Sequence, residues 1–143
     1  MKHRTLNIEH RTSNSTSNRV FDLEERLLEF ASTIMDLSEK LPNTRSGNHV
    51  AGQLLRCGTS PYSNHGEAES AESADDFIPK LKVCLKELRE TRRWLRLVHR
   101  KNWLAQDGQL NWALNEVEEL IRIFIASIRT ANQNRLRGKP ASG

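Results

Sequence analysis

The chain has 143 residues, of which 36% are apolar and 28% are charged, and its formal net charge is +4. This length is typical of one domain and suffices to bury a core without disulfides or metals. No run of about 18 uninterrupted apolar residues is present to span a membrane, and the N-terminus lacks the apolar run of a secretion signal. We therefore expect a cytoplasmic protein.

The excess positive charge is concentrated at the two ends of the chain. Residues 1–19 have a net charge of +3 and residues 129–143 a net charge of +4, which leaves −3 for the residues between them. Basic tails either aid solubility or hold a polyanion by folding on contact. We predict disordered basic tails over residues 1–19 and 135–143, with one helical domain over residues 20–134.

A first helix is predicted over residues 21–40, because apolar residues recur there at alternating steps of four and three. Its apolar seam consists of Leu23, Leu27, Phe30, Ile34, Leu37 and Leu41. Acidic residues in the first turn suit the helix dipole, and Pro42 ends the helix.

A second helix is predicted from a cap at Thr44 or Ser46 to a region between Ala68 and Glu72. This segment is rich in small residues and contains Pro61, which lacks an amide hydrogen and disrupts helical hydrogen bonding. Either the helix breaks at Pro61, or the small residues let a neighbouring helix pack closely over a bend. We favour one kinked helix.

The two cysteines, Cys57 and Cys84, fall at seam positions of the second and third helices. We interpret them as small buried hydrophobic residues. A disulfide is not expected in the cytoplasm, and no CxxC pair indicates zinc or redox chemistry.

A third helix is predicted from Ser73 to Asn102, where Ser73 and Asp76 resemble a capping box. Leu81, Leu88 and Leu95 take the a positions of its heptads. Six basic residues take the b and f positions, which face away from the seam. They are Lys82, Lys86, Arg89, Arg93, Arg96 and Arg100.

Like charges three or four residues apart destabilise a helix by a few tenths of a kcal/mol per pair, so this row predicts anionic neighbours. One source is the protein itself, through acids of another helix or subunit; the first helix supplies Glu25, Glu29, Asp36 and Glu39. The other source is the phosphate backbone of RNA or DNA, which such residues contact without reading sequence.

A fourth helix is predicted over residues 109–134, after a turn at Asp107 and Gly108. Its apolar surface is wider than one seam requires, and Trp94, Trp103 and Trp112 lie near this turn. The surplus indicates either a subunit contact or a thicker core. Since no alternation long enough for a sheet occurs, the four amphipathic helices predict an all-α, antiparallel, up-down-up-down four-helix bundle.

No enzyme, cofactor or metal site is indicated by the motifs. HExxH, P-loop, GxGxxG and GxSxG patterns are absent. His49, Cys57 and His65 are eight residues apart, and each step rotates about 80° around a helix, so they do not converge on a metal. The acidic cluster is best explained as a solvated corner; it comprises Glu67, Glu69, Glu72, Asp75 and Asp76.

Residues 52–97, GQLLRCGTSPYSNHGEAESAESADDFIPKLKVCLKELRETRRWLRL, closely resemble a bacterial four-helix-bundle family. Its members were read from intervening sequences in 23S ribosomal RNA genes and are often labelled ribosomal protein S23. The resemblance extends over residues 19–131 and implies an antiparallel bundle that assembles into a homopentamer. It transfers no catalytic residue.

The chain is also similar to the accessory protein of diversity-generating retroelements, a basic pentameric bundle implicated in binding nucleic acid and a reverse transcriptase. That relative is more strongly basic than this chain. Around the second helix, we further predict a hydrogen-bonded network that ties this helix to the third. Its members are Arg56, Asn64, Glu67, Ser73, Glu87 and Glu90.

These observations predict a non-enzymatic homo-oligomer that binds RNA or DNA weakly and without sequence preference, through the basic row of the third helix and the basic tails. The alternative is a structural or adaptor oligomer whose basic face pairs with acids of neighbouring subunits or of a protein partner.

Overall fold

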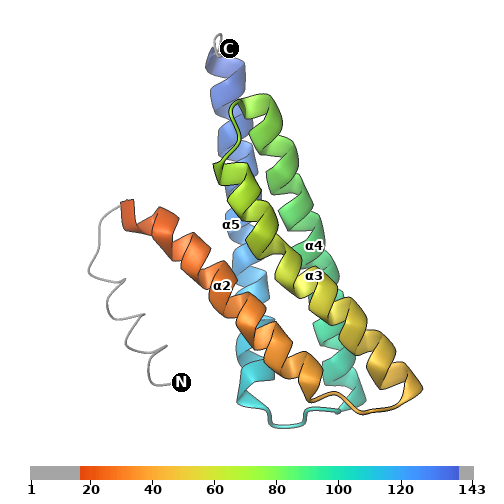
Figure 1. The fold of residues 1–143 in the computed structure, drawn as a ribbon. Coiled ribbons are helices and arrows are strands. Elements are labelled where there is room, and N and C mark those ends of the chain that lie inside the picture. The colour runs from red at the N-terminus through yellow and green to blue at the C-terminus, as the bar shows by residue number, and fades with distance from the viewer. Residues whose placement is uncertain (1–16, 139–143) are drawn as a thin grey trace.

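The computed structural model describes residues 17–138, with side chains over 23–137, and within this part the chain forms four helices and no strand. The helices are α2 (Ser17–Glu39), α3 (Arg45–Glu69), α4 (Ala74–Lys101) and α5 (Gly108–Gly138). They run alternately up and down (Figure 1), which confirms the predicted all-α four-helix bundle. Of the predicted tails, residues 1–16 and 139–143 lie outside the described part.

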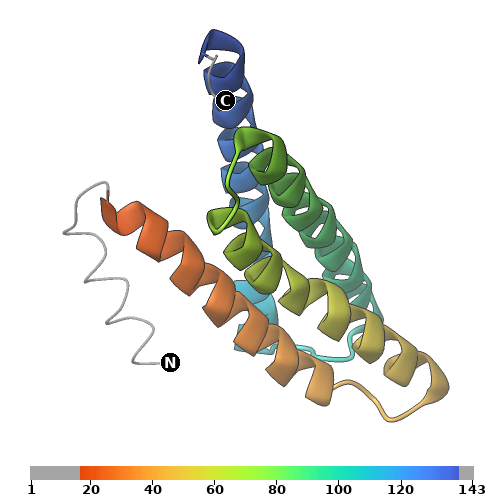
Figure 2. The ribbon, with the colours of Figure 1, turned by 45° about the horizontal axis from the view of Figure 1, so that its top comes forward.

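Each helix packs mainly against the helices that precede and follow it in the chain, and α2 also contacts α5. Two views show that α2 diverges from α5 toward its N-terminal end (Figures 1 and 2). Within residues 17–138, α4 packs mainly against α3 and α5, which leaves its outer face exposed.

The predicted caps of α3 and α4 are present. Thr44 Oγ1 accepts a hydrogen bond from the amide of Gly47 at 3.0 Å, and Ser73 Oγ accepts one from the amide of Asp76 at 3.3 Å. Each cap satisfies one of the amide groups that the first turn of a helix leaves without an intrahelical partner. The choice between Thr44 and Ser46 is thus settled in favour of Thr44.

The turn between α4 and α5 begins at Asn102, whose φ of 58° places it in the left-handed region that commonly ends helices. Asp107 Oδ1 accepts hydrogen bonds from the amides of Gln109 at 2.8 Å and Leu110 at 3.2 Å, and so caps α5. Lys40 Nζ lies 2.9 Å from Asp107 Oδ2, which joins this turn to the end of α2.

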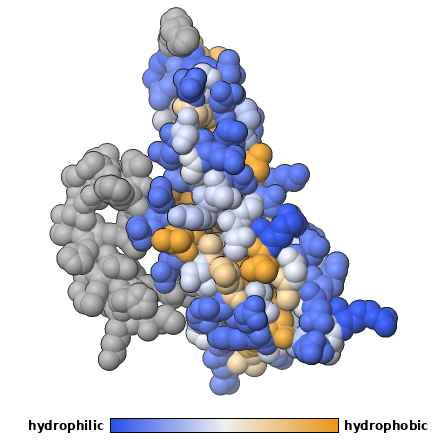
Figure 3. Space-filling view, in the orientation of Figure 1, coloured by the Kyte–Doolittle hydropathy of each residue, from blue (hydrophilic) through white to orange (hydrophobic). Residues whose placement is uncertain are grey.

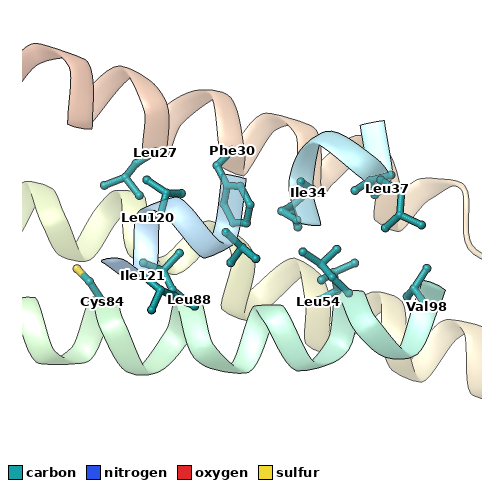
Figure 4. Packing of buried hydrophobic residues seen from close by; sticks show 14 of the residues in the cluster. Leu27, Phe30, Ile34, Leu37, Leu54, Cys84, Leu88, Val98, Leu120 and Ile121 are labelled. Atoms are coloured by element: carbon teal, nitrogen blue, oxygen red, sulfur yellow. The ribbon is translucent and has the colours of Figure 1, made fainter. Parts of the chain in front are cut away.

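The core is one cluster of apolar side chains from all four helices (Figure 4). Leu27, Phe30 and Ile34 of α2 are at most 1% exposed, as the seam of the first helix predicts. Leu81, Leu88 and Leu95 of α4 are buried in the same way. The heptad assignment of α4 is therefore confirmed, and it turns the b and f positions outward.

Cys57 and Cys84 are free and buried, as predicted. Burial raises the pKa of the Cys57 thiol to about 11 and that of the Cys84 thiol to about 12. Both residues therefore act as small apolar side chains, since their thiolate forms are strongly disfavoured at neutral pH.

Helix α3 continues through Pro61 as a single helix, so the segment does not break there. The close helix packing expected from its small residues occurs at Gly58, where an added Cβ would lie only 2.6 Å from Ile34 Cγ2. Cys84 Sγ of α4 approaches the Pro61 carbonyl oxygen to 3.7 Å. Small residues thus bring α2 and α4 close to this helix.

Helix α5 ends later than the sequence pattern indicates. The bundle was predicted to end at residue 134, whereas α5 continues to Gly138. Arg135 Nη1 lies 2.9 Å from Asp75 Oδ1 at the start of α4, and basic residues in a last turn suit the helix dipole. Apolar periodicity ends near Ile128, so the pattern could not show a polar extension held by charge.

Candidate nucleic-acid interface

The six predicted cations lie together on the outer face of α4, and all six are exposed. They alternate along the helix with buried residues of its inner face, such as Leu88 and Leu95. The row runs from Lys82 to Arg100 and so spans about 27 Å at a rise of 1.5 Å per residue. The structure therefore brings these residues onto one surface, which we call the basic row.

None of the six side chains has a carboxylate partner among residues 23–137. The ion pairs found there use other cations, namely Arg26, Lys40, Arg56, His65, Lys80, Arg92 and Arg135. The acids of α2 that were considered as neutralising partners belong to a helix that packs mainly against α3 and α5. The repulsion within the row is thus not relieved by the described part of the same chain.

The flanks of α4 contrast with its outer face. Arg92, which directly precedes Arg93 in the sequence, turns toward α5, and its Nη1 lies 3.0 Å from Glu118 Oε1. On the other flank, Arg56 of α3 forms ion pairs with two acids of α4. Its Nη1 lies 3.2 Å from Glu87 Oε1, and its Nη2 lies 2.5 Å from Glu90 Oε2. The acids nearest the basic row are therefore already engaged with a cation from a neighbouring helix.

The predicted polar network between α3 and α4 is present in part. Arg56 bridges Glu87 and Glu90, and Glu90 also accepts a hydrogen bond from Trp94 Nε1 at 3.3 Å. Asn64, however, donates to Ser60 of its own helix at 3.2 Å. The prediction that Asn64 links the two helices is wrong, because its amide lies beside a hydroxyl one turn earlier.

Of the other two predicted members, one caps a helix and one makes only a weak contact between α3 and α4. Ser73 is occupied as the α4 cap. Glu67 lies 3.8 Å from Lys80, a long and exposed pair that contributes little stability. Among the predicted residues, the shorter links between α3 and α4 are therefore those of Arg56 with Glu87 and Glu90.

Two hollows adjoin the basic row, and both include Trp94 and Leu97. One has a volume of about 740 Å³ and lies over the outer side of α4, between Arg93 and Arg100. The other, about 820 Å³, opens toward the start of α3 at Arg45 and His49. The periodicity of the sequence did not predict these hollows. The one sequence feature that could have indicated them is Leu97, an apolar residue between Arg96 and Arg100 of the basic row.

The remaining candidate groups do not form a metal site within the described residues. The five members of the acidic cluster are all exposed at the turn between α3 and α4. His49 packs edge-on to Trp94, whereas His65 is buried with its ring edge-on to Phe124. Burial lowers the pKa of His65, and the nearby Glu69 and Glu24 oppose this effect.

The comparisons with known proteins support the bundle architecture. Residues 21–126 match the family model described as 23S rRNA-intervening sequence protein. The chain belongs to the 23S rRNA-intervening sequence protein family. This match includes the entire basic row and both hollows, and it ends before the last part of α5.

A crystal structure from the same family is similar to this chain. It is a protein of unknown function from the S23 ribosomal protein family of Bacteroides thetaiotaomicron, with 36% sequence identity and a TM-score of 0.68. The alignment covers 75% of this chain and 98% of that protein. No curated protein matches this chain. In residues 17–138, no helix is both long and apolar enough to cross a bilayer.

Proposed function

We propose that this family member is a non-enzymatic, cytoplasmic, oligomeric helical bundle that binds RNA or DNA weakly and without sequence preference. The observation that carries this proposal is the basic row: six exposed cations on one helix face that have no carboxylate partner within residues 23–137. Flexible cations on a bare helix surface bind phosphates by charge and do not read bases.

The matched contrast within the chain supports this proposal. Where α4 faces another helix, Arg92 has a carboxylate partner, as does Arg56 of α3. Where α4 faces solvent, Arg89, Arg93 and Arg96 have no carboxylate partner among the residues whose side chains are described. The missing anions would therefore be supplied from outside the described chain. Arg135 and Arg137, exposed at the end of α5, add positive charge beyond the row.

Exposed apolar side chains support self-assembly. Leu28 and Met35 of α2 are 43% and 52% exposed, and Leu55 and Tyr62 of α3 are 39% and 37% exposed. On the face formed by α2 and α3, apolar residues gather between polar ones (Figure 3). We propose that this face contacts another subunit, in a homopentamer as the resemblance implies. In α5, Leu110 and Leu120 of the apolar surplus are buried in the core, whereas Ile125 is only partly buried.

Filter binding of labelled RNA and duplex DNA at increasing salt tests the proposal. The logarithm of the affinity should fall linearly with the logarithm of salt concentration, with a slope of about −0.9 per neutralised phosphate on a duplex. Contacts from all six residues would give a slope of about −5. Absence of binding even at low salt would remove the proposal.

Two neighbouring arginines provide a matched control. Arg93→Gln removes a cation of the basic row and should make the slope shallower by about one unit. Arg92→Gln removes the same charge from the next position, where it already faces Glu118, and should leave the slope nearly unchanged. Equal effects of the two variants would show that only net charge matters.

A second candidate is a structural or adaptor oligomer. The exposed acidic cluster at the turn between α3 and α4 favours it, because this cluster could face the basic row of another copy. Charge reversal at Arg89 and Arg93 separates the two functions. In the adaptor, the reversal breaks the assembly seen by light scattering. In the nucleic-acid binder, it spares the assembly and abolishes retention of the nucleic acid.

A further inference from the structure

The two hollows beside the basic row share an apolar centre formed by Trp94 and Leu97. Leu97 is 41% exposed and lines the first hollow together with Arg93, Arg96 and Arg100. Part of this apolar side chain therefore faces solvent beside the charged row. The floor of the site is thus apolar, and its rim is mainly cationic. One acid, Glu90, also lines the first hollow and is paired with Arg56.

Trp94 is positioned as a fixed element of this floor. Its indole Nε1 donates to Glu90 at 3.3 Å, and Arg56 of α3 holds the same carboxylate. The His49 ring packs edge-on against it, with ring centroids 5.9 Å apart. The polar atom of the indole is therefore satisfied, and the half-buried ring offers apolar contact to whatever enters the hollows.

The opposite side of the floor also carries a cation. Arg45, at the start of α3, lines the second hollow together with His49. A ligand that crosses Trp94 and Leu97 therefore meets positive groups before and after the apolar contact. A polyanion with flat apolar groups at regular intervals along its backbone matches this alternation.

Building on the proposed function, the geometry points to single-stranded nucleic acid as the preferred ligand, with an unpaired base stacked against Trp94 and Leu97 while its phosphates contact the basic row. A duplex has its bases stacked inside and can offer only phosphates to this face. Single-strand binders combine a basic track with aromatic side chains on which bases stack, whatever their sequence.

The test compares three probes on the full chain: an oligothymidylate, a duplex of the same length, and inorganic polyphosphate as an anion without bases. Fluorescence anisotropy at one fixed salt concentration should give at least about fivefold tighter binding of the oligothymidylate than of the duplex. Equal affinity for all three probes overturns the inference but leaves phosphate binding intact. No binding of any probe overturns the proposed function as well.

Leu97→Ala provides the most direct variant, with Val83→Ala as its control. Both residues lie on α4 beside the basic row and are similarly exposed, at 41% and 43%, but Val83 lines neither hollow. Leu97→Ala should weaken oligothymidylate binding several-fold with the salt slope and polyphosphate affinity unchanged. Val83→Ala should change none of them, and equal losses in both variants overturn the inference.

Trp94→Leu removes the stacking ring and should weaken oligothymidylate binding by at least about fivefold. Because Trp94 is half-buried, the thermal stability of Trp94→Leu is measured alongside its binding. If Trp94→Leu is unstable, the result for Leu97→Ala tests the inference instead. A polyglutamate peptide serves as the fourth probe. Tighter binding of this peptide than of the oligothymidylate would overturn the inference in favour of an acidic protein partner.

Discussion

Arg26 on α2 and Glu116 on α5 form a two-point ion pair, with Nε and Nη2 of the arginine 2.8 Å and 2.9 Å from the two carboxylate oxygens. The pair connects the first and last of the described helices. The hydrogen bonds that Arg26 donates to Glu116 raise the pKa of its guanidinium, and burial only partly opposes this. The geometry therefore predicts a stabilising contact.

Glu116→Ala should lower the free energy of unfolding by about 1–3 kcal/mol, since it leaves a half-buried guanidinium without its main partner. The carboxylate is only 11% exposed, so solvent replaces it poorly. Glu118→Ala is the control, because that residue is 44% exposed in its pair with Arg92 and should cost less than about 0.5 kcal/mol. Urea denaturation measures both, and equal costs would contradict the prediction.

Gly58→Ala should destabilise the protein by about 1–3 kcal/mol. The new methyl group would lie 2.6 Å from Ile34 Cγ2, in a core where neither helix can move freely. Gly52→Ala, on the same helix but with no atom near its added methyl group, should instead stabilise the protein by up to about 1 kcal/mol. Opposite shifts in the urea midpoint are expected, and destabilisation by both substitutions would disagree with the packing.

The helices and their caps follow from local rules, which is why the sequence predicts them well. Thr44 and Ser73 lie at the ends of apolar periods, and any helix beginning there needs an acceptor for its first amides. The buried seam of α4 can also be predicted from this segment alone, because the period of a helix fixes which residues share a face. The outward direction of the basic row follows directly from the burial of Leu88 and Leu95.

The pairing of individual charges could not be predicted, because it depends on how neighbouring helices are rotated. Arg92 and Arg93 are adjacent and chemically identical, yet within the described part of the chain Arg92 meets the carboxylate of Glu118 and Arg93 meets none. The hollows at Trp94 also require the relative placement of α3, α4 and α5, which no pattern within one helix contains. The predicted link from Asn64 to α4 was wrong for the same reason, since the side chain donates to Ser60 of its own helix.

His65 should make the protein less stable in mild acid. Its side chain is only 3% exposed, and burial lowers its pKa in the folded state, so the unfolded chain binds the proton more readily. Stability from the neutral imidazole is therefore fully present above the unfolded pKa of about 6.5 and is lost as the pH falls toward the folded value. Glu69, at 3.5 Å, moderates the loss.

Urea midpoints between about pH 7.5 and about pH 5 measure this effect. His65→Leu should flatten the decline over that range. Since Phe124 packs against the His65 ring, the substitution also alters the stability at neutral pH. Therefore only the change of the urea midpoint with pH is compared between the variant and the original protein. If this change is the same in His65→Leu, His65 is not the cause of the lower stability in acid.

The two thiols should be inert in the folded protein and reactive once it unfolds. Cys57 and Cys84 are fully buried, and burial raises their pKa values to about 11 and about 12, so neither access nor thiolate formation favours alkylation near neutral pH. Iodoacetamide followed by mass spectrometry should show no modification under native conditions and two in urea, since the sequence has only these two cysteines. Rapid labelling of Cys84 in the native protein would mean that α3 separates from α4 near Pro61, where the thiol now contacts the carbonyl.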